Sequence, residues 1–250
     1  MAKDQPITTE TEERVPGFWS PENLRSIVVL IAVILCFRWS VASPYHVPTA
    51  SMEPTIKVGD RLLAYKLAYN LKIPFTDTVL AGWGEPQRAD IIVFKYPKEP
   101  DIDYVKRVVG VAGDHIRIAD DILYVNDTPQ LRDDHNADRT ILEDIEDRKD
   151  IKELYREKLG PVEHWVMQNR PEARTFSSST WPATGSFEVP KDSVFVCGDN
   201  RDNSTDSRVW GVVPLSYVRG KALIVIWSMY SPKEAFLPRF RFDRFGLKLI

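Results

Sequence analysis

Asp90–Tyr96 (DIIVFKY) and Tyr104–Val111 (YVKRVVGV) are two short runs rich in valine, isoleucine and aromatic residues. Such side chains favour β-strands, and clusters of glycine, proline, aspartate and asparagine separate the runs as turns would. Runs of the same kind follow at His115–Ile118, Leu123–Val125, Ser193–Cys197 and Ala222–Trp227. No alternation of strand and helix patterns points to a parallel sheet. The chain from Tyr45 onward is therefore predicted to be mainly β, with antiparallel strands.

Composition narrows the class of protein. Of 250 residues, 43% are hydrophobic and 28% charged, which is ordinary for a globular chain and excludes a wholly disordered one. The net charge of −3 shows no excess of basic residues, so we expect no nucleic-acid partner. Cys36 and Cys197 cannot build a disulfide framework, and the four histidines stand too far apart for metal-ligand spacing. We predict neither a metal nor a cofactor.

The segment before the predicted strands has the features of a membrane anchor. Ile27–Phe37 is an unbroken apolar run of eleven residues, and its extension to Leu24–Ala42 gives nineteen. About 20 residues are needed to cross the hydrocarbon layer. Interfacial side chains flank the run on both sides: Trp19, Arg25, Arg38 and Trp39. We predict a transmembrane anchor at residues 24–43.

Two other interpretations of the apolar run compete with an anchor. A buried core helix would usually carry a polar face, and none is visible. A cleavable signal peptide is favoured by the small-x-small triplet Ser40-Val41-Ala42, but residues 1–26 have a net charge of −2 where a basic region is expected. We therefore expect an uncleaved anchor with a cytoplasmic tail at 1–23, although the arginines on its two sides do not settle orientation.

A charged stretch interrupts the β pattern. Between Leu131 and Lys158, ten acidic and seven basic residues occupy twenty-eight positions, with Glu/Lys pairs at helical spacing. We expect an exposed helix here, within an inserted cap at 131–187. The cap would divide the β domain into a first part at 44–130 and a second part at 188–250.

Three sequence blocks stand out from this background. Each has an ordinary structural interpretation when taken alone. A serine between prolines is usually a turn residue, and a strand lysine usually faces solvent. An Asp/Asn-rich loop can bind calcium, but Ser207 stands where an EF-hand loop needs glycine. The blocks are Val47–Thr55 (VPTASMEPT), Tyr104–Asp114 (YVKRVVGVAGD) and Val196–Pro214 (VCGDNRDNSTDSRVWGVVP).

In this order, after a membrane segment, the three blocks resemble those of bacterial type I signal peptidases (leader peptidases). The resemblance covers the anchor, residues 45–126 and residues 188–227. It implies an antiparallel β catalytic domain with one N-terminal transmembrane helix and an inserted α/β cap. It also implies endoproteolysis by a serine–lysine dyad that removes signal peptides from exported preproteins after a small-x-small motif. The catalytic domain would lie on the periplasmic or extracytoplasmic side of the inner (plasma) membrane, with the lipid bilayer and the translocation machinery as further partners.

The resemblance also assigns roles to individual residues. Ser51 matches the nucleophile and Lys106 the general base. Ser204 matches a serine that orients the lysine, and Thr49 matches a hydroxyl that joins the Ser51 backbone N–H in the oxyanion hole. Four further positions match supporting ion pairs: Arg107, Asp199, Asp206 and Arg208.

Elementary chemistry agrees with the lysine assignment. A serine hydroxyl needs a base to take its proton. At the ordinary lysine pKa of about 10.4, only ~1 amine in 2,500 is neutral at pH 7, and burial can lower that pKa by about 3–5 units. Strand alternation puts Lys106 on one face with Tyr104 and Val108, while Arg107 faces the other way. Lys106 therefore has the apolar neighbours that a neutral amine requires.

Position along the chain indicates the kind of substrate. Ser51 lies nine residues past Ala42, so it is within about 30 Å of the membrane exit. An extended peptide docking as an added strand points alternate side chains the same way, which would explain small-x-small selection. We predict that apolar neighbours of the dyad form the pocket walls: Tyr45, Val47, Pro48, Met52, Ile56 and Tyr104.

The sequence departs from the pattern of the family that it resembles at one point, and it leaves one alternative function open. Thr49-Ala50-Ser51 replaces the frequent Ser-Gly-Ser, so Ala50 must have a negative φ. A self-cleaving repressor-type peptidase would need a DNA-binding head, for which residues 1–26 are too short and too acidic. A non-catalytic, membrane-anchored β module that binds exported chains is the remaining alternative.

Overall fold

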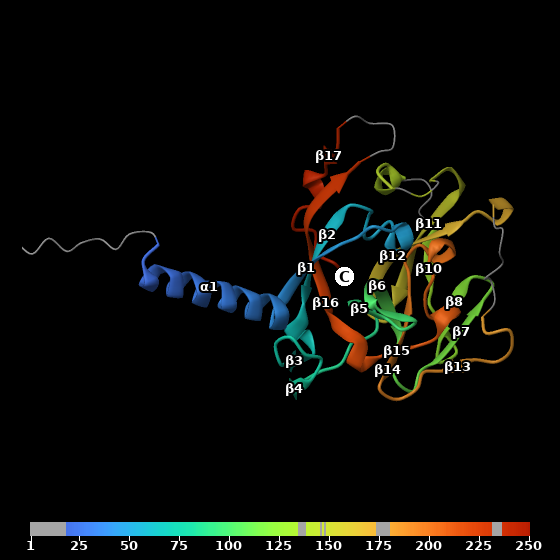
Figure 1. Cartoon of the computed structure of the whole chain (residues 1–250). Coiled ribbons are helices and arrows are strands. Elements are labelled where there is room, and N and C mark those ends of the chain that lie inside the picture. The colour runs from blue at the N-terminus through green and yellow to red at the C-terminus, as the bar shows by residue number, and fades with distance from the viewer. Residues whose placement is uncertain (1–18, 135–138, 146, 148, 174–180, 232–236) are drawn as a thin grey trace, which may run out of the picture.

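A single long helix, α1 (Pro21–Ser40), projects from a β-rich body (Figure 1). The structure is a computed structural model that describes residues 19–134, 139–145, 147, 149–173, 181–231 and 237–250. The helix begins where the Ser20 hydroxyl accepts a hydrogen bond from the backbone N–H of Asn23 at 3.2 Å, and Pro21 occupies its first turn. It therefore starts and ends three residues before the expected 24–43. Most of the expected tail, residues 1–18, lies outside the described residues.

No residue of α1 is buried in the protein, and apolar side chains cover its surface. Its 20 residues at 1.5 Å each give about 30 Å, the thickness of the hydrocarbon layer. In water this exposed apolar surface would be unfavourable at roughly 25 cal/mol per Å². The length and exposure of α1 are those of a membrane span.

The main sheet contains eight strands, all paired antiparallel. The order along the sheet is β1-β2-β16-β5-β6-β14-β15, and β17 pairs with β16. The bounds are β1 (Ala42–His46), β2 (Asp60–Tyr65), β5 (Ile91–Tyr96), β6 (Glu99–Gly110), β14 (Ser193–Cys197), β15 (Val213–Pro214), β16 (Val218–Tyr230) and β17 (Arg239–Phe240). The runs expected at 90–96, 104–111, 193–197 and 222–227 form β5, β6, β14 and β16 apart from the end residues Asp90 and Val111, so the mainly antiparallel β fold is confirmed.

Three smaller sheets accompany the main one. The order β13-β7-β8-β9 joins β7 (His115–Ala119), β8 (Ile122–Val125), β9 (Thr128–Pro129) and β13 (Phe187–Glu188). The order β10-β11-β12 joins β10 (Arg132–Asp134), β11 (Lys152–Leu159) and β12 (Val162–Asn169). The hairpin β3 (Asn70–Lys72) and β4 (Val79–Gly82) lies beside the end of α1 (Figure 1).

The exposed helix expected between Leu131 and Lys158 is wrong for the residues that the structure describes there. They form β10, two 3-10 turns and β11, which pairs with β12 along its whole length. The charge pattern led to a wrong prediction because two of the charged residues, Lys152 and Glu157, are buried rather than exposed to solvent. Burial of these two charges together with apolar strand residues favours a hairpin over a solvated helical face.

Three apolar clusters form the core around the main sheet, and two of them include residues of β6. Val109 packs with residues of β7, β8 and β14, whereas Val108 packs with Phe94 and Trp210. A third cluster joins the segment after β1 to β2 and β16. Because both faces of the second half of β6 are packed against apolar side chains, the orientations of the side chains there are restricted.

Candidate active site

Ser51 lies on a short 3-10 turn, Ala50–Met52, that follows β1. The turn is closed by a hydrogen bond from the Glu53 N–H to the Ala50 carbonyl at 3.1 Å, and it is anchored by the fully buried Met52 side chain. Ala50 is not among the described residues with positive φ, so alanine fits where the family frequently has glycine. Thr49, just before the turn, has extended backbone.

Lys106 reaches Ser51 from the middle of β6. Its Nζ atom lies 2.6 Å from the Ser51 Oγ atom and 3.0 Å from the Val105 carbonyl oxygen. The lysine is 3% exposed, and its Nζ atom lies 5.3 Å from the centre of the Tyr104 ring. An amine within hydrogen-bond distance of a hydroxyl, and shielded from water, can act as a base only if it is neutral.

Burial lowers the pKa of Lys106 to about 8, against the opposing effect of the carboxylates of Asp206 and Asp199. At pH 7 roughly a tenth of such amines are neutral, compared with ~1 in 2,500 for an exposed lysine. Burial of this one side chain therefore leaves a neutral fraction of the amine that can accept a proton at neutral pH.

Two buried ion pairs surround this amine. Arg107 donates from Nε and Nη2 to the two Asp199 oxygens, each at 2.8 Å. Arg208 bonds both Asp206 oxygens in the same way, also at 2.8 Å, and the Gly198 N–H donates to Asp206 at 3.0 Å. These arginines keep the pKa of each carboxyl group below its ordinary value in spite of burial. The Arg107–Asp199 pair fixes the loop after β14 against β6, whereas the Arg208–Asp206 pair lies within the segment that follows β14.

Ser204 does not make the contact expected of it. Lys106 donates to Ser51 and Val105 and makes no hydrogen bond with Ser204, whose hydroxyl instead helps to lower the pKa of the Asp206 carboxyl group. The hydroxyl packs against the backbone of Gly198, where an added Cβ would lie 2.3 Å from it and 2.4 Å from the Ser51 carbonyl oxygen. Ser204 is thus close to the nucleophile's backbone rather than bonded to the lysine.

Thr49 is brought to the same place as Ser51. Its Oγ1 atom lies 3.4 Å from the Ser51 Oγ atom on the exposed side of the site. The Thr49 hydroxyl and the Ser51 backbone N–H therefore lie next to the reacting oxygen, where two donors could face a developing oxyanion.

A cleft of about 450 Å³ opens over the dyad. Four of the six predicted wall residues line it: Tyr45, Val47, Pro48 and Tyr104. The prediction is wrong for Met52 and Ile56, which are 0% exposed and belong to the core. Sequence reasoning missed other lining residues, since apolar strand residues look like core residues: Leu62, Val93, Ile102 and Val105.

A second set of missed residues lies behind Ser51. The Asn200 side chain donates to the Ala50 carbonyl at 3.1 Å, and its backbone N–H donates to the Ser51 carbonyl at 3.2 Å. Asp147 and Lys152, from the inserted segment, bond Asn200 at 2.8 Å and 3.1 Å. Asn200 stands in the third sequence block, but no local pattern marks Asp147 or Lys152.

The described residues contain no group of three or more histidine, cysteine, aspartate or glutamate side chains that could hold a metal ion. The cleft is also lined by His46 and Asp103, but the pair in hydrogen-bond contact there is the Ser51 hydroxyl and the buried Lys106 amine. A β body with this site and one apolar helix defines a membrane-associated hydrolase of the serine type.

Comparison with known proteins agrees with that class. The family model described as "Signal peptidase, peptidase S26" matches residues 21–227. A signal peptidase I of Pseudomonas fluorescens is 36% identical over 234 residues, which cover 89% of this chain and 77% of the relative. One from Pseudomonas aeruginosa is also 36% identical, covering 86% and 75%, and one from Aquifex aeolicus is 33% identical, covering 86% and 88%.

The chain belongs to the signal peptidase S26 family. It is therefore a serine peptidase, and α1 is the membrane anchor that the apolar N-terminal sequence predicted.

Proposed function

We propose that this protein removes N-terminal signal peptides from exported preproteins, with Ser51 as the nucleophile and Lys106 as the general base. The observation that carries the proposal is the 2.6 Å separation of the Ser51 Oγ and Lys106 Nζ atoms at the floor of a cleft. The lowered pKa of Lys106 supports the base role, because the neutral amine can accept the serine proton.

The reaction follows from these positions. Neutral Lys106 takes the hydroxyl proton as the Ser51 oxygen attacks the carbonyl carbon of the scissile peptide bond. The resulting oxyanion would face the Ser51 backbone N–H and the Thr49 hydroxyl. The lysine ammonium then gives its proton to the leaving amine, and an acyl-enzyme forms. A water molecule, deprotonated by Lys106, releases the signal peptide and restores the serine.

The edges of the main sheet support docking of the substrate as an added strand. In the described sheet β1 is an edge strand, and β6 is paired with β14 only from Arg107 onward. The first half of β6 and the outer edge of β1 both border the cleft, through Ile102–Lys106 and Tyr45–Val47. An extended peptide between them would direct alternate side chains into the floor, which fits selection of small residues before the cut.

The anchor supports a substrate held at the membrane. β1 begins two residues after α1 ends, and Ser51 follows within a few residues, so the cleft is tied close to the lipid surface. We assign the catalytic body to the periplasmic or extracytoplasmic side of the inner membrane, where preproteins emerge from the translocation machinery. That machinery and the bilayer are the partners expected in addition to the preprotein.

Preprotein cleavage by the full chain in detergent tests the proposal. We expect the wild type to cut after the small-x-small motif, and Ser51→Ala and Lys106→Ala to be inactive while they unfold at the wild-type temperature. Equal cleavage by all three would exclude the dyad. A wild-type protein that binds the preprotein without cutting it would favour the non-catalytic β module. The buried Lys106 argues against that module, because binding alone does not need a desolvated amine.

A further inference from the structure

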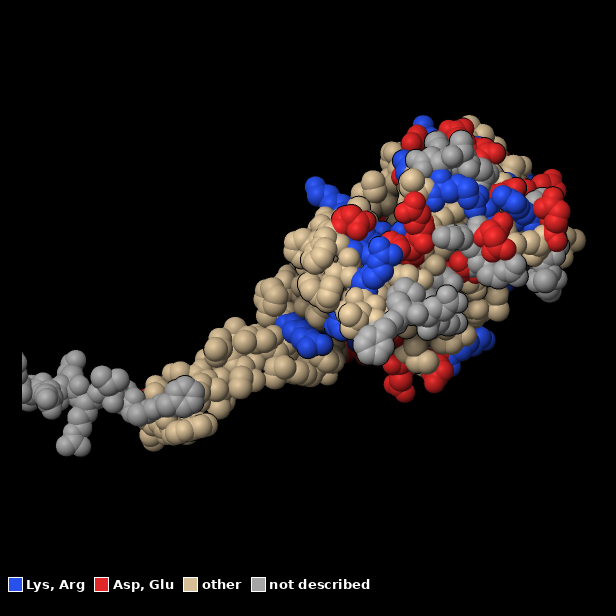
Figure 2. Space-filling model, turned by 90° about the horizontal axis from the view of Figure 1, so that it is seen from above, with Lys and Arg blue, Asp and Glu red and all other residues tan. Residues whose placement is uncertain are grey.

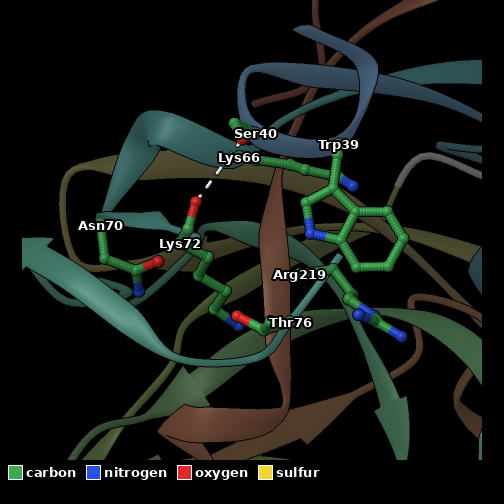
Figure 3. A pocket seen from close by; sticks show the side chains of 7 residues that line it. All are labelled: Trp39, Ser40, Lys66, Asn70, Lys72, Thr76 and Arg219. Atoms are coloured by element: carbon green, nitrogen blue, oxygen red, sulfur yellow. Dashed lines mark hydrogen bonds between the residues drawn. The ribbon is translucent and has the colours of Figure 1, made fainter. Parts of the chain in front are cut away.

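The end of α1 meets the catalytic body at a small cationic pocket, separate from the cleft. Trp39 and Ser40 contribute from the last turn of the helix. The other lining residues come from three later segments: Lys66, Asn70, Lys72, Thr76 and Arg219. Figure 3 shows the side chains of Lys66, Lys72 and Arg219 gathered around this space, beside the Trp39 ring.

Lys66 has no anionic partner in this pocket. Its Nζ atom lies 5.4 Å from the centre of the Trp39 ring, and it makes no ion pair or hydrogen bond with any residue that the structure describes. Burial and the nearby Arg219 charge lower the pKa of Lys66 to about 8, against the opposing effect of the more distant Asp103 carboxylate. A half-buried cation next to like charges is a site that a bound anion would stabilise.

The other two cations are only partly neutralised. Lys72 donates to the Val218 carbonyl at 2.9 Å, which satisfies a donor but brings no negative charge. Arg219 pairs with Asp77 at 3.2 Å and with Asp103 at 3.4 Å, and Asp77 is shared with Lys95. The carboxylates of Asp77 and Asp103 are therefore shared among four cationic side chains: Lys66, Lys72, Lys95 and Arg219. Together these six side chains keep a net positive charge.

The surroundings of the pocket match a membrane interface. Phe75, at the tip of the β3–β4 hairpin, is 60% exposed, and its ring lies 5.2 Å from the Trp39 ring. Leu80 and Trp83, on the same hairpin, are also exposed. Figure 2 shows basic side chains where the apolar helix joins the body. Apolar and aromatic side chains next to cations at the end of a transmembrane helix are typical of residues at the depth of the lipid phosphates.

We propose that this pocket binds the phosphate of an anionic phospholipid headgroup at the end of α1. The open space inside is about 10 Å³, room for one water, so the phosphate would sit at the mouth between Lys66 and Arg219. The bound lipid would hold the catalytic body at a fixed height and tilt over the bilayer. The proposal rests on α1 spanning the membrane, as the proposed function requires.

Native mass spectrometry of the full chain in neutral detergent tests this inference, with short-chain phosphatidylglycerol and phosphatidylcholine as probes. We expect the wild type to retain phosphatidylglycerol more tightly than phosphatidylcholine. Each lost cation should weaken the anionic lipid about fivefold, so Lys66→Gln combined with Arg219→Gln should weaken it about 25-fold. Lys66→Arg should restore binding, and Lys158→Gln, on an exposed lysine of β11, should change nothing.

Other results would overturn the inference. Equal retention of phosphatidylglycerol by the wild type and the double variant would show that the pocket does not bind this lipid. Equal binding of phosphatidylglycerol and phosphatidylcholine by the wild type would show that it has no preference for anionic lipid. Inorganic phosphate that binds as tightly as phosphatidylglycerol would make this a small-anion site. Flotation of the chain with phosphatidylcholine vesicles tests the anchor separately, and preprotein cleavage by the double variant tests the dyad separately.

Discussion

The Lys152 Nζ atom lies 3.1 Å from the Asn200 Oδ1 atom, and this contact joins the inserted hairpin to the loop behind the nucleophile. The amide nitrogen of the same Asn200 donates to the Ala50 carbonyl, one residue before Ser51. Lys152 is 1% exposed, and Asp147 lies 2.7 Å from its Nζ atom. The orientation of the Asn200 amide, and with it the turn that carries Ser51, therefore depends on a lysine from the insertion.

Lys152→Met should lower kcat about tenfold to a hundredfold, because small displacements of a nucleophile have effects of up to about that size. We expect little change in KM, since Lys152 does not line the cleft. Cleavage kinetics and thermal unfolding of the full chain measure both effects. The matched control is Lys158→Met, on the same strand but exposed. Unchanged kcat in Lys152→Met would show that the hairpin does not position the turn.

The pH dependence of cleavage should follow the titration of Lys106. The amine works as a base only when neutral, and its folded pKa is lowered to about 8. We therefore expect kcat/KM to rise with pH, about tenfold per unit below pH 7, and to level off above pH 8. A profile set by a histidine would level off near pH 6.5 instead. Rates from pH 6 to 9.5 on one preprotein distinguish the two.

Lys106→Arg should abolish cleavage even though it keeps a positive charge. The guanidinium group stays protonated at every accessible pH, so it cannot take the Ser51 proton. It must also fit where a lysine is 3% exposed. We expect a rate no higher than that of Ser51→Ala, at every pH from 6 to 9.5. Activity in Lys106→Arg that recovers at high pH would contradict the base assignment.

The buried pair of Arg107 and Asp199 should contribute to stability rather than to chemistry. Arg107→Met leaves the Asp199 carboxylate buried without its partner, which typically costs about 3–5 kcal/mol. Urea unfolding at pH 7 measures this loss. The folded pKa of Asp199 lies below its ordinary value, so the stabilisation is present at neutral pH and is lost as the pH falls through that lower pKa. The difference between wild type and variant should therefore narrow in acid.

Local patterns predicted the strands well because each strand is a short β-branched run between turn residues. The alternation along β6 also put Lys106 and Arg107 on opposite faces, which the structure confirms through their separate contacts with Ser51 and Asp199. Both inferences need only neighbouring residues in the sequence. They do not depend on which strands pair.

Patterns of neighbouring residues do not predict the direction of a side chain within a turn, or the contacts between segments far apart in the sequence. Met52 and Ile56 are close to Ser51 in sequence, but successive side chains of a 3-10 turn diverge by about 120°, so Met52 enters the core while Ser51 faces the cleft. Lys152 carries the same charge as any solvated lysine, and only the folded hairpin places it against Asn200. The cleft walls from β2 and β5 depend on strand pairing in the same way.

Gly198→Ala should impair catalysis while leaving the fold intact. An added Cβ would lie 2.3 Å from the Ser204 hydroxyl and 2.4 Å from the Ser51 carbonyl oxygen, both well inside contact distance. The Ser204 hydroxyl can rotate away, but the Ser204 Cβ atom, at 2.6 Å, cannot, and the carbonyl belongs to the turn that carries Ser51. Relief of the clash must therefore move Ser51 relative to the Lys106 Nζ atom, 2.6 Å from its hydroxyl. We expect kcat to fall at least tenfold.

The matched control is Gly82→Ala in β4, where an added Cβ meets no atom within 4 Å. It should cleave at the wild-type rate. Combining Gly198→Ala with Ser204→Ala removes the hydroxyl contact but leaves the contacts with the residue-204 Cβ atom and with the Ser51 carbonyl, so activity should not recover. Full recovery in that double variant would mean that the clash with the Ser204 hydroxyl alone disturbs the site, and that the backbone at Ser51 adjusts without loss of activity.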